Sequence, residues 1–123
     1  MKSAEVLRFP RIKNHIEEFI AHDLPCVLEN LKLFGLINGY GYTCRITYEF
    51  KRGVDFYVFV EGRQIPIQLT DNPDMIPVFL NQGIMTIFLP EKDKKGEKLF
   101  PSERKEIVMN KLEKISKQVA YFK

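Results

Sequence analysis

The fold is decided by three consecutive segments of alternating apolar and polar residues, the second of which reads Val54-Asp55-Phe56-Tyr57-Val58-Phe59-Val60. The segment before it, residues 42–50, is apolar at every second position and mostly polar between. A period of two predicts strands with one buried side and one solvent-facing side. The second segment departs from this pattern, because Tyr57 and Phe59 place aromatic rings on the side that its neighbour leaves polar.

These segments predict a mostly antiparallel meander of four strands, because each is separated from the next by glycine-containing or proline-containing turns. Proline at position 66 predicts that the third strand lies at an edge of the sheet, since proline cannot donate to a strand ladder. Pro77 interrupts another apolar run, which leaves two interpretations: a strand, or an element that covers the second face of the sheet. The expected strands are residues 42–50, 54–60, 64–70 and 84–89, and the ambiguous run is residues 75–80.

Helical periodicity flanks the predicted sheet on both sides. The first helix is expected to open at Pro10 and to be broken or kinked at Pro25, after which a second short helix follows. Near the other end, apolar residues recur at intervals of three and four, which predicts a last helix with Ser102 as its cap. That stripe is Val108, Leu112, Ile115, Val119 and Phe122.

The expected architecture is therefore a single α+β domain spanning residues 1–123. Its N-terminal helices precede the four-stranded sheet, and its C-terminal helix packs on the same sheet face. With 45% apolar and 28% charged residues, the composition is that of an ordinary globular protein. No apolar run approaches the roughly 20 residues that cross a bilayer, and two cysteines make no disulfide framework, so a cytoplasmic protein without membrane contact is expected.

The residues that could carry chemistry do not form a recognisable site. His22 and Cys26 have a spacing of four, but Pro25 disturbs their register and further ligands are missing, so no metal and no cofactor is expected. Cys44 lies on the apolar side of its predicted strand, where a thiol is unreactive. The carboxylate pairs at 17–18 and 71–74 suit a solvated helix face and a turn. We therefore expect no enzymatic activity.

Positive charge gathers near the end of the chain and supports an alternative function, nucleic-acid binding. Residues 91–123 hold ten basic and six acidic side chains, a balance of +4, whereas the whole chain has +3. Acidic residues alternate with the basic ones, and phosphate binding needs clustered charge. The alternative site comprises Lys94, Lys95, Lys98, Arg104 and Lys105.

The favoured hypothesis is a non-enzymatic protein-binding module that uses an exposed sheet face. An adaptor, a small chaperone, or an inhibitor such as an immunity or anti-defence protein would fit, with another protein or a second copy of the chain as partner. An apolar centre with a polar rim is typical of an interaction patch. The competing interpretation is that another element of the chain covers the two aromatics. The expected binding residues are Tyr57, Phe59, Arg45, Thr47, Gln64 and Gln68.

Overall fold

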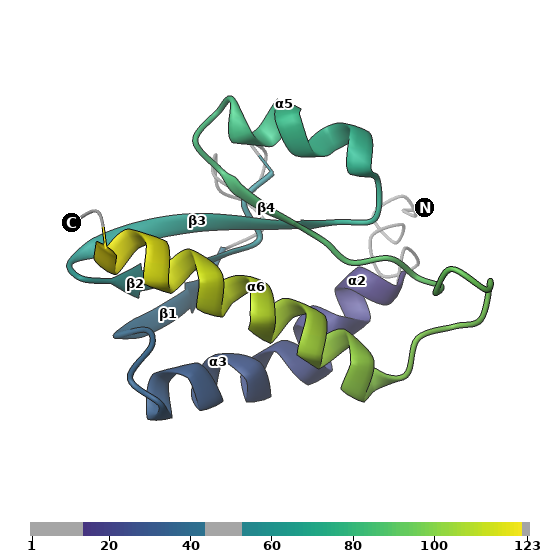
Figure 1. The fold of residues 1–123 in the computed structure, drawn as a ribbon, viewed down its shortest axis with the longest axis horizontal. Coiled ribbons are helices and arrows are strands. Elements are labelled where there is room, and N and C mark those ends of the chain that lie inside the picture. Colours follow the sequence, from purple (N-terminus) through teal and green to yellow (C-terminus); the bar gives the residue numbers. More distant parts are fainter. Residues whose placement is uncertain (1–13, 44–52, 122–123) are drawn as a thin grey trace, which may run out of the picture.

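The computed structural model describes residues 14–43 and 53–121, which form helices and a four-stranded sheet (Figure 1). Strands β1, β2 and β3 are antiparallel neighbours, and β4 joins β3 in parallel, so the sheet is mixed. The α+β architecture predicted from the sequence is confirmed, and the strands follow one another in sequence order. Their bounds are Gly39–Tyr42 for β1, Phe56–Val60 for β2, Arg63–Thr70 for β3 and Met85–Phe88 for β4.

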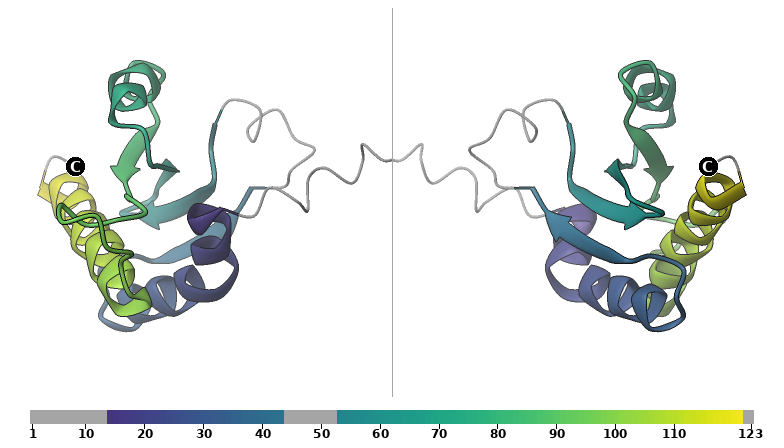
Figure 2. Two further views of the ribbon diagram at one scale, coloured as in Figure 1. Left: turned by 90° about the vertical axis from the view of Figure 1, so that its right-hand side faces the viewer. Right: turned by 90° about the vertical axis from the view of Figure 1, so that its left-hand side faces the viewer.

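The long helices lie on one side of this sheet. In Figure 1, α3 and α6 lie below and in front of the strands, and α5 lies on the far side from α3, as the two views of Figure 2 also show. No helix within the described ranges is long and apolar enough to cross a membrane. The helical elements are α2 (His15–Glu18), the π-helical η1 (Phe19–Asp23), α3 (Leu24–Leu33), the 3-10 turn η2 (Pro73–Met75), α5 (Ile76–Leu80) and α6 (Pro101–Tyr121).

The first described helix begins at His15, and the predicted start at Pro10 lies outside the described residues. Asn14 is its cap, and its side-chain oxygen accepts hydrogen bonds from the amides of Ile16 and Glu17, both at 3.0 Å. The interruption expected at Pro25 is the π-helical turn η1, after which α3 starts with proline in its first turn. Proline is tolerated there because the first amides of a helix have no partner within it.

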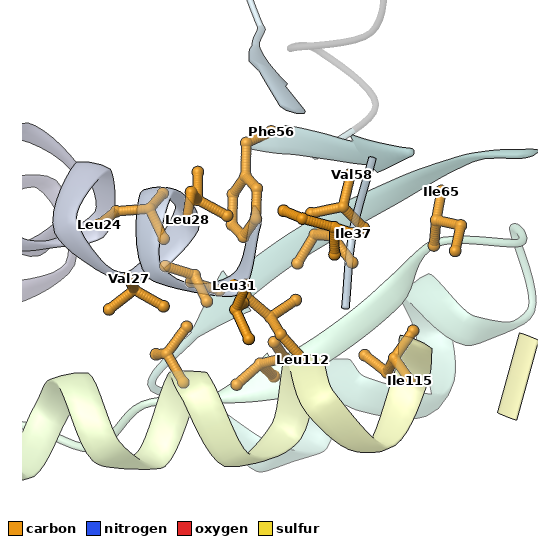
Figure 3. Close-up of a cluster of buried hydrophobic side chains, with 14 of the residues drawn as sticks. Leu24, Val27, Leu28, Leu31, Ile37, Phe56, Val58, Ile65, Leu112 and Ile115 are labelled. Atoms are coloured by element: carbon orange, nitrogen blue, oxygen red, sulfur yellow. The ribbon is translucent and has the colours of Figure 1, made fainter. Parts of the chain in front are cut away.

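The core lies between the inner side of the sheet and these helices. Phe56 and Val58 point from β2 toward α3 and α6, as predicted by the alternating pattern (Figure 3). From the helices, α3 contributes four fully buried side chains and α6 contributes the predicted stripe through Ile115, with Val119 partly buried. Phe122 lies outside the described residues. The helix contributions to the core are Leu24, Val27, Leu28, Leu31, Val108, Leu112 and Ile115.

The expectation that β3 is an edge strand was wrong. β3 lies between β2 and β4, and its ladder with β4 starts at Ile67, one residue after Pro66. The proline therefore precedes the pairing with β4 and does not interrupt it. The ambiguous residues 75–80 fold as the end of η2 and as α5, and this helical crossover is what makes β3 and β4 parallel.

The first strand also differs from its predicted bounds. The described strand β1 ends at Tyr42, where the predicted strand begins, and its four residues pair with Phe56 to Phe59 of β2. The rest of the predicted strand, from residue 44 to residue 50, lies outside the described residues. The sequence did not predict a strand at residues 39–42 because glycine, which occupies positions 39 and 41, is depleted in strands.

The charged residues 91–98 form a closed hairpin that leads into α6. One carboxylate oxygen of Asp93 accepts hydrogen bonds from the amides of Lys95 and Glu97, at 2.8 and 2.9 Å. The helix itself starts at Pro101, and the amide of Phe100 donates to the carboxylate of Glu103 at 2.7 Å. The predicted cap, Ser102, is therefore already inside the first turn, and Glu103 satisfies the amide just before the helix.

A long-range hydrogen bond ties α2 to the segment after β4. His15 is only 7% exposed, and its Nε2 donates to the carbonyl of Leu89 at 2.8 Å.

Replacing His15 by alanine would leave this buried carbonyl unpaired, so we expect a loss of about 1 to 3 kcal/mol in the free energy of unfolding. His22→Ala is the matched control, because His22 is exposed on η1. Equal midpoints of the two variants in a denaturant melt would contradict this prediction.

Candidate functional site

The predicted aromatic pair lies on the side of the sheet away from α3 and α6, which we call the outer face. Tyr57 is opposite Gly41 on β1 and Pro66 on β3, while Phe59 is opposite Gly39 and Gln64. Directly opposed residues in a sheet share a face, so these side chains belong together. Both aromatics are partly exposed.

The two glycines of β1 are a part of this surface that the sequence did not predict. A Cβ added at Gly39 would be 3.8 Å from Cδ2 of Phe59, and one added at Gly41 would have no atom within 4 Å. Gly39 therefore leaves the flank of the Phe59 ring without a side-chain neighbour on β1, and Gly41 leaves open space opposite Tyr57. The alternation in Gly39-Tyr40-Gly41-Tyr42 is the signal for this strand, but glycines after a helix are equally typical of helix termination and a turn.

The structure brings together only part of the predicted binding set. Gln64 lies opposite Phe59, but Gln68 lies farther along β3, opposite Thr86 of β4. Arg45 and Thr47 lie outside the described residues. The compact part of the outer face is thus Tyr57 and Phe59 with Gln64, Pro66 and the two glycines of β1.

The basic residues of the alternative site differ in exposure, and Lys105 on α6 is half-buried. Lys94, Lys95 and Lys98 are exposed on the hairpin that precedes α6. Arg104 is only 9% exposed, and its Nη2 donates to the carbonyl of Glu91 at 3.5 Å. Because its guanidinium points into the protein, Arg104 holds the hairpin against α6 and is not available to a phosphate at the surface.

The histidines and the described cysteine do not gather with carboxylates. His15 is committed to the Leu89 carbonyl, and Cys26 is a free, exposed thiol. Within residues 14–43 and 53–121, no three metal-ligating side chains come close enough to hold an ion. Cys44 lies outside those ranges.

A cleft of about 400 Å³ opens where α2 meets the ends of β1 and β3, and no sequence pattern predicted it. Asp55 connects two of the segments that line this cleft. Its backbone carbonyl accepts a hydrogen bond from the amide of Thr43 at 3.2 Å, and its Oδ2 accepts one from the amide of Leu69 at 2.8 Å. The apolar lining residues are Ile16, Ile20, Ala21 and Leu69, and the polar ones are Asn14, Glu17, Tyr42, Thr43, Asp55, Gln68, Thr70 and Asp71.

Two buried oxygen atoms of cleft residues lack partners. Oγ1 of Thr43 and Oε1 of Gln68 are inaccessible to solvent, and neither makes a hydrogen bond within the described part of the chain. Such atoms are rare in folded proteins, because a buried polar group without a partner has lost its hydration without compensation. Both residues line the cleft, but the two oxygens themselves are turned away from solvent.

Two tyrosines of β1 lie on the inner side of the sheet, next to α3. The hydroxyl of Tyr40 donates to Oε2 of Glu29 at 2.6 Å, and this hydrogen bond to a carboxylate is the main reason why the pKa of Tyr40 rises to about 12. The rings of Tyr40 and Tyr42 meet edge to face, with centroids 6.1 Å apart. Burial, followed by the negative charge of Glu29, raises the pKa of Tyr42 as well, so both phenols are neutral at physiological pH.

The chain matches no known family model, and no curated protein or solved structure is significantly similar to it. Its function must therefore be argued from the two surfaces themselves, the outer face and the cleft.

The hydrogen bond between Tyr40 and Glu29 predicts a pH dependence. The pKa of Tyr40 is raised from 10.0 to about 12, so its stabilising effect is complete below pH 10 and is lost as the pH rises through that interval. Ultraviolet titration of the wild type against Tyr40→Phe should isolate one phenol with a pKa near 12. In Glu29→Gln that pKa should fall toward 10.0, since the carboxylate that disfavours phenolate is gone. An unchanged titration in Glu29→Gln would refute this assignment.

Proposed function

We propose that the protein is a non-enzymatic protein-binding module whose outer face contacts the partner. The observation that carries this proposal is the pairing of two partly exposed aromatics with two glycines across β1 and β2. Tyrosine and phenylalanine supply large apolar contact areas at low cost in conformational entropy, and they are enriched at the centres of interfaces. An adaptor, a small chaperone and an inhibitor all fit this description, as does self-association.

The arrangement of the helices supports the same proposal. α3 and α6 share one core with the inner side of the sheet, and α5 packs mainly on β4. Phe79 of α5 lies directly over Gly53, where an added Cβ would be 2.3 Å from the ring, so α5 is fixed at the end of the sheet near residue 53. The central part of the outer face thus keeps its two aromatics partly exposed.

We further propose a cytoplasmic location, in keeping with the free thiol of Cys26 and with a chain of only two cysteines. Nucleic-acid binding through the hairpin is the second candidate, supported by the exposure of Lys94, Lys95 and Lys98. The burial of Arg104 removes one of the five residues on which that candidate depended.

The first test fills the outer face instead of truncating it. Gly41→Thr adds a side chain opposite Tyr57, and because its Cβ would have no atom within 4 Å, folding should be unaffected or slightly favoured. Binding should fall, because the new side chain occupies space on the outer face that a partner would use. Partner capture from native lysate, followed by affinity measurement with the recombinant partner and by sedimentation for self-association, provides the readout. Full retention of every association by Gly41→Thr would rule out the outer face.

The complementary test removes the aromatics. Tyr57→Ser and Phe59→Ser should each weaken association by roughly thirtyfold, the effect of losing about 2 kcal/mol at the centre of an interface. Phe100→Ser is the matched control, because Phe100 is 70% exposed but precedes α6, away from the sheet. Denaturant melts of all three variants separate an effect on binding from an effect on folding. A large drop in midpoint with unchanged association would mean that the rings serve the fold alone.

The nucleic-acid candidate has its own test. If the hairpin lysines bind phosphate, replacing Lys94, Lys95 and Lys98 by glutamine should flatten the salt dependence of affinity by roughly one unit of slope for each lysine that neutralises a phosphate. We expect no appreciable affinity of the wild type for generic single or double strands at physiological salt. Micromolar or tighter binding that is abolished in the triple variant would favour this candidate over the protein-binding proposal.

A further inference from the structure

We propose that the partner of the outer face is a second copy of the chain, so that two sheets pack face to face through Tyr57 and Phe59. This inference rests on the proposed function and names its partner. When two sheets pack through one face of each, they lie about 10 Å apart and their side chains interdigitate. Three properties of the molecule favour this partner: the charge of the outer face, its shape, and the position of the basic residues.

The outer face carries no charge within the described strands. Residues that lie opposite one another across a sheet share a face, and on the outer side of β1–β4 they are glycine, aromatic, glutamine, proline or threonine. Two charged residues continue the alternation, Asp55 and Glu61, but they lie beyond the ends of β2. A charged partner would lose hydration here without gaining an opposite charge, whereas a second copy brings an uncharged surface.

The shape of the outer face allows it to fit a copy of itself. Tyr57 projects from β2, and Gly41 lies directly opposite on β1, where an added Cβ would meet no atom within 4 Å. Neighbouring strands are about 4.8 Å apart, so a large ring and an open space lie side by side. A two-fold axis between β1 and β2 would place Tyr57 of each copy over Gly41 of the other. Each contact then forms twice, as in every isologous interface.

The basic residues lie on the other side of the molecule. The chain has a net charge of +3, and Lys111 and Lys114 are exposed on α6, which packs against the inner side of the sheet (Figure 2). Contact between two outer faces leaves the two α6 helices at opposite ends of the dimer. Repulsion between the positive charges of the two copies is therefore small in this arrangement, because it weakens with distance and with screening.

The first measurement is sedimentation of the purified full chain at increasing concentration. We expect the average mass to rise from monomer to dimer with a dissociation constant on the order of 0.1 mM, because few aromatic side chains carry the contact. Gly41→Thr should weaken this self-association by at least about tenfold, since its side chain fills the space that a ring would occupy. Its midpoint in a denaturant melt should stay near that of the wild type.

An exchange of charge tests whether the outer face meets itself. Gln64 is exposed and lies opposite Phe59, so Gln64→Lys and Gln64→Glu should both fold normally. At about 0.01 M salt, where screening extends over roughly 30 Å, each variant alone should dimerise at least about tenfold more weakly than the wild type, because like charges meet. An equimolar mixture of the two should regain dimers, because lysine then faces glutamate. Gln118→Lys and Gln118→Glu are the matched controls, because Gln118 is exposed on α6.

Three results would overturn the proposal. The first is a wild type that stays monomeric up to about 1 mM. The second is a dimer that tolerates both Gln64 variants as well as it tolerates the Gln118 controls, which would place the contact elsewhere. The third is a mixture that dimerises no better than either Gln64 variant alone. A monomeric wild type that still captures another protein, and loses it in Gly41→Thr, would leave the outer face as a binding surface and exclude only the second copy.

Discussion

Burial of one side of β2 against α3 and α6 is the constraint on which the rest of the structure depends. Phe56 and Val58 are fully buried, and truncating such a core aromatic costs about 3 to 5 kcal/mol, a large part of the stability of a small domain. Because the side chains of a strand alternate, fixing these residues inward sets Tyr57 and Phe59 on the outer face. The packing that stabilises the fold and the placement of the proposed binding surface thus have the same origin.

The sequence predicted those features that depend on local periodicity. The inward residues of β2, the stripe of α6 and the glycine-containing turn between β2 and β3 follow from neighbours in the chain. In that turn, Glu61 and Gly62 both have positive φ. The order of strands around β3 does not, because it depends on whether residues 73–80 form a strand or a crossover helix. Either proline could break a strand, but Pro66 precedes the ladder with β4, and Pro77 lies in the first turn of α5.

In the candidate sites, too, the sequence predicted what depends on local pattern and missed what depends on contacts between distant segments. The aromatic pair of the outer face was predicted from its break in the alternating pattern, yet the glycines opposite were not, since only the register of β1 against β2 brings them there. The cleft could not be predicted at all. Its lining comes from segments near residues 14–21, 42–43, 55 and 68–71, and each polar residue by itself suits an ordinary cap, turn or strand end.

The outer face and the cleft share strand β3, so a partner bound to the outer face would lie close to the cleft. Gln64 lies beside Phe59 on the outer face, and Gln68 lines the cleft four residues later, roughly 13 Å along an extended strand. An interface of ordinary size covers about 800 Å² on each protein and extends farther than that. The aromatics would supply most of the affinity, because they bury apolar area.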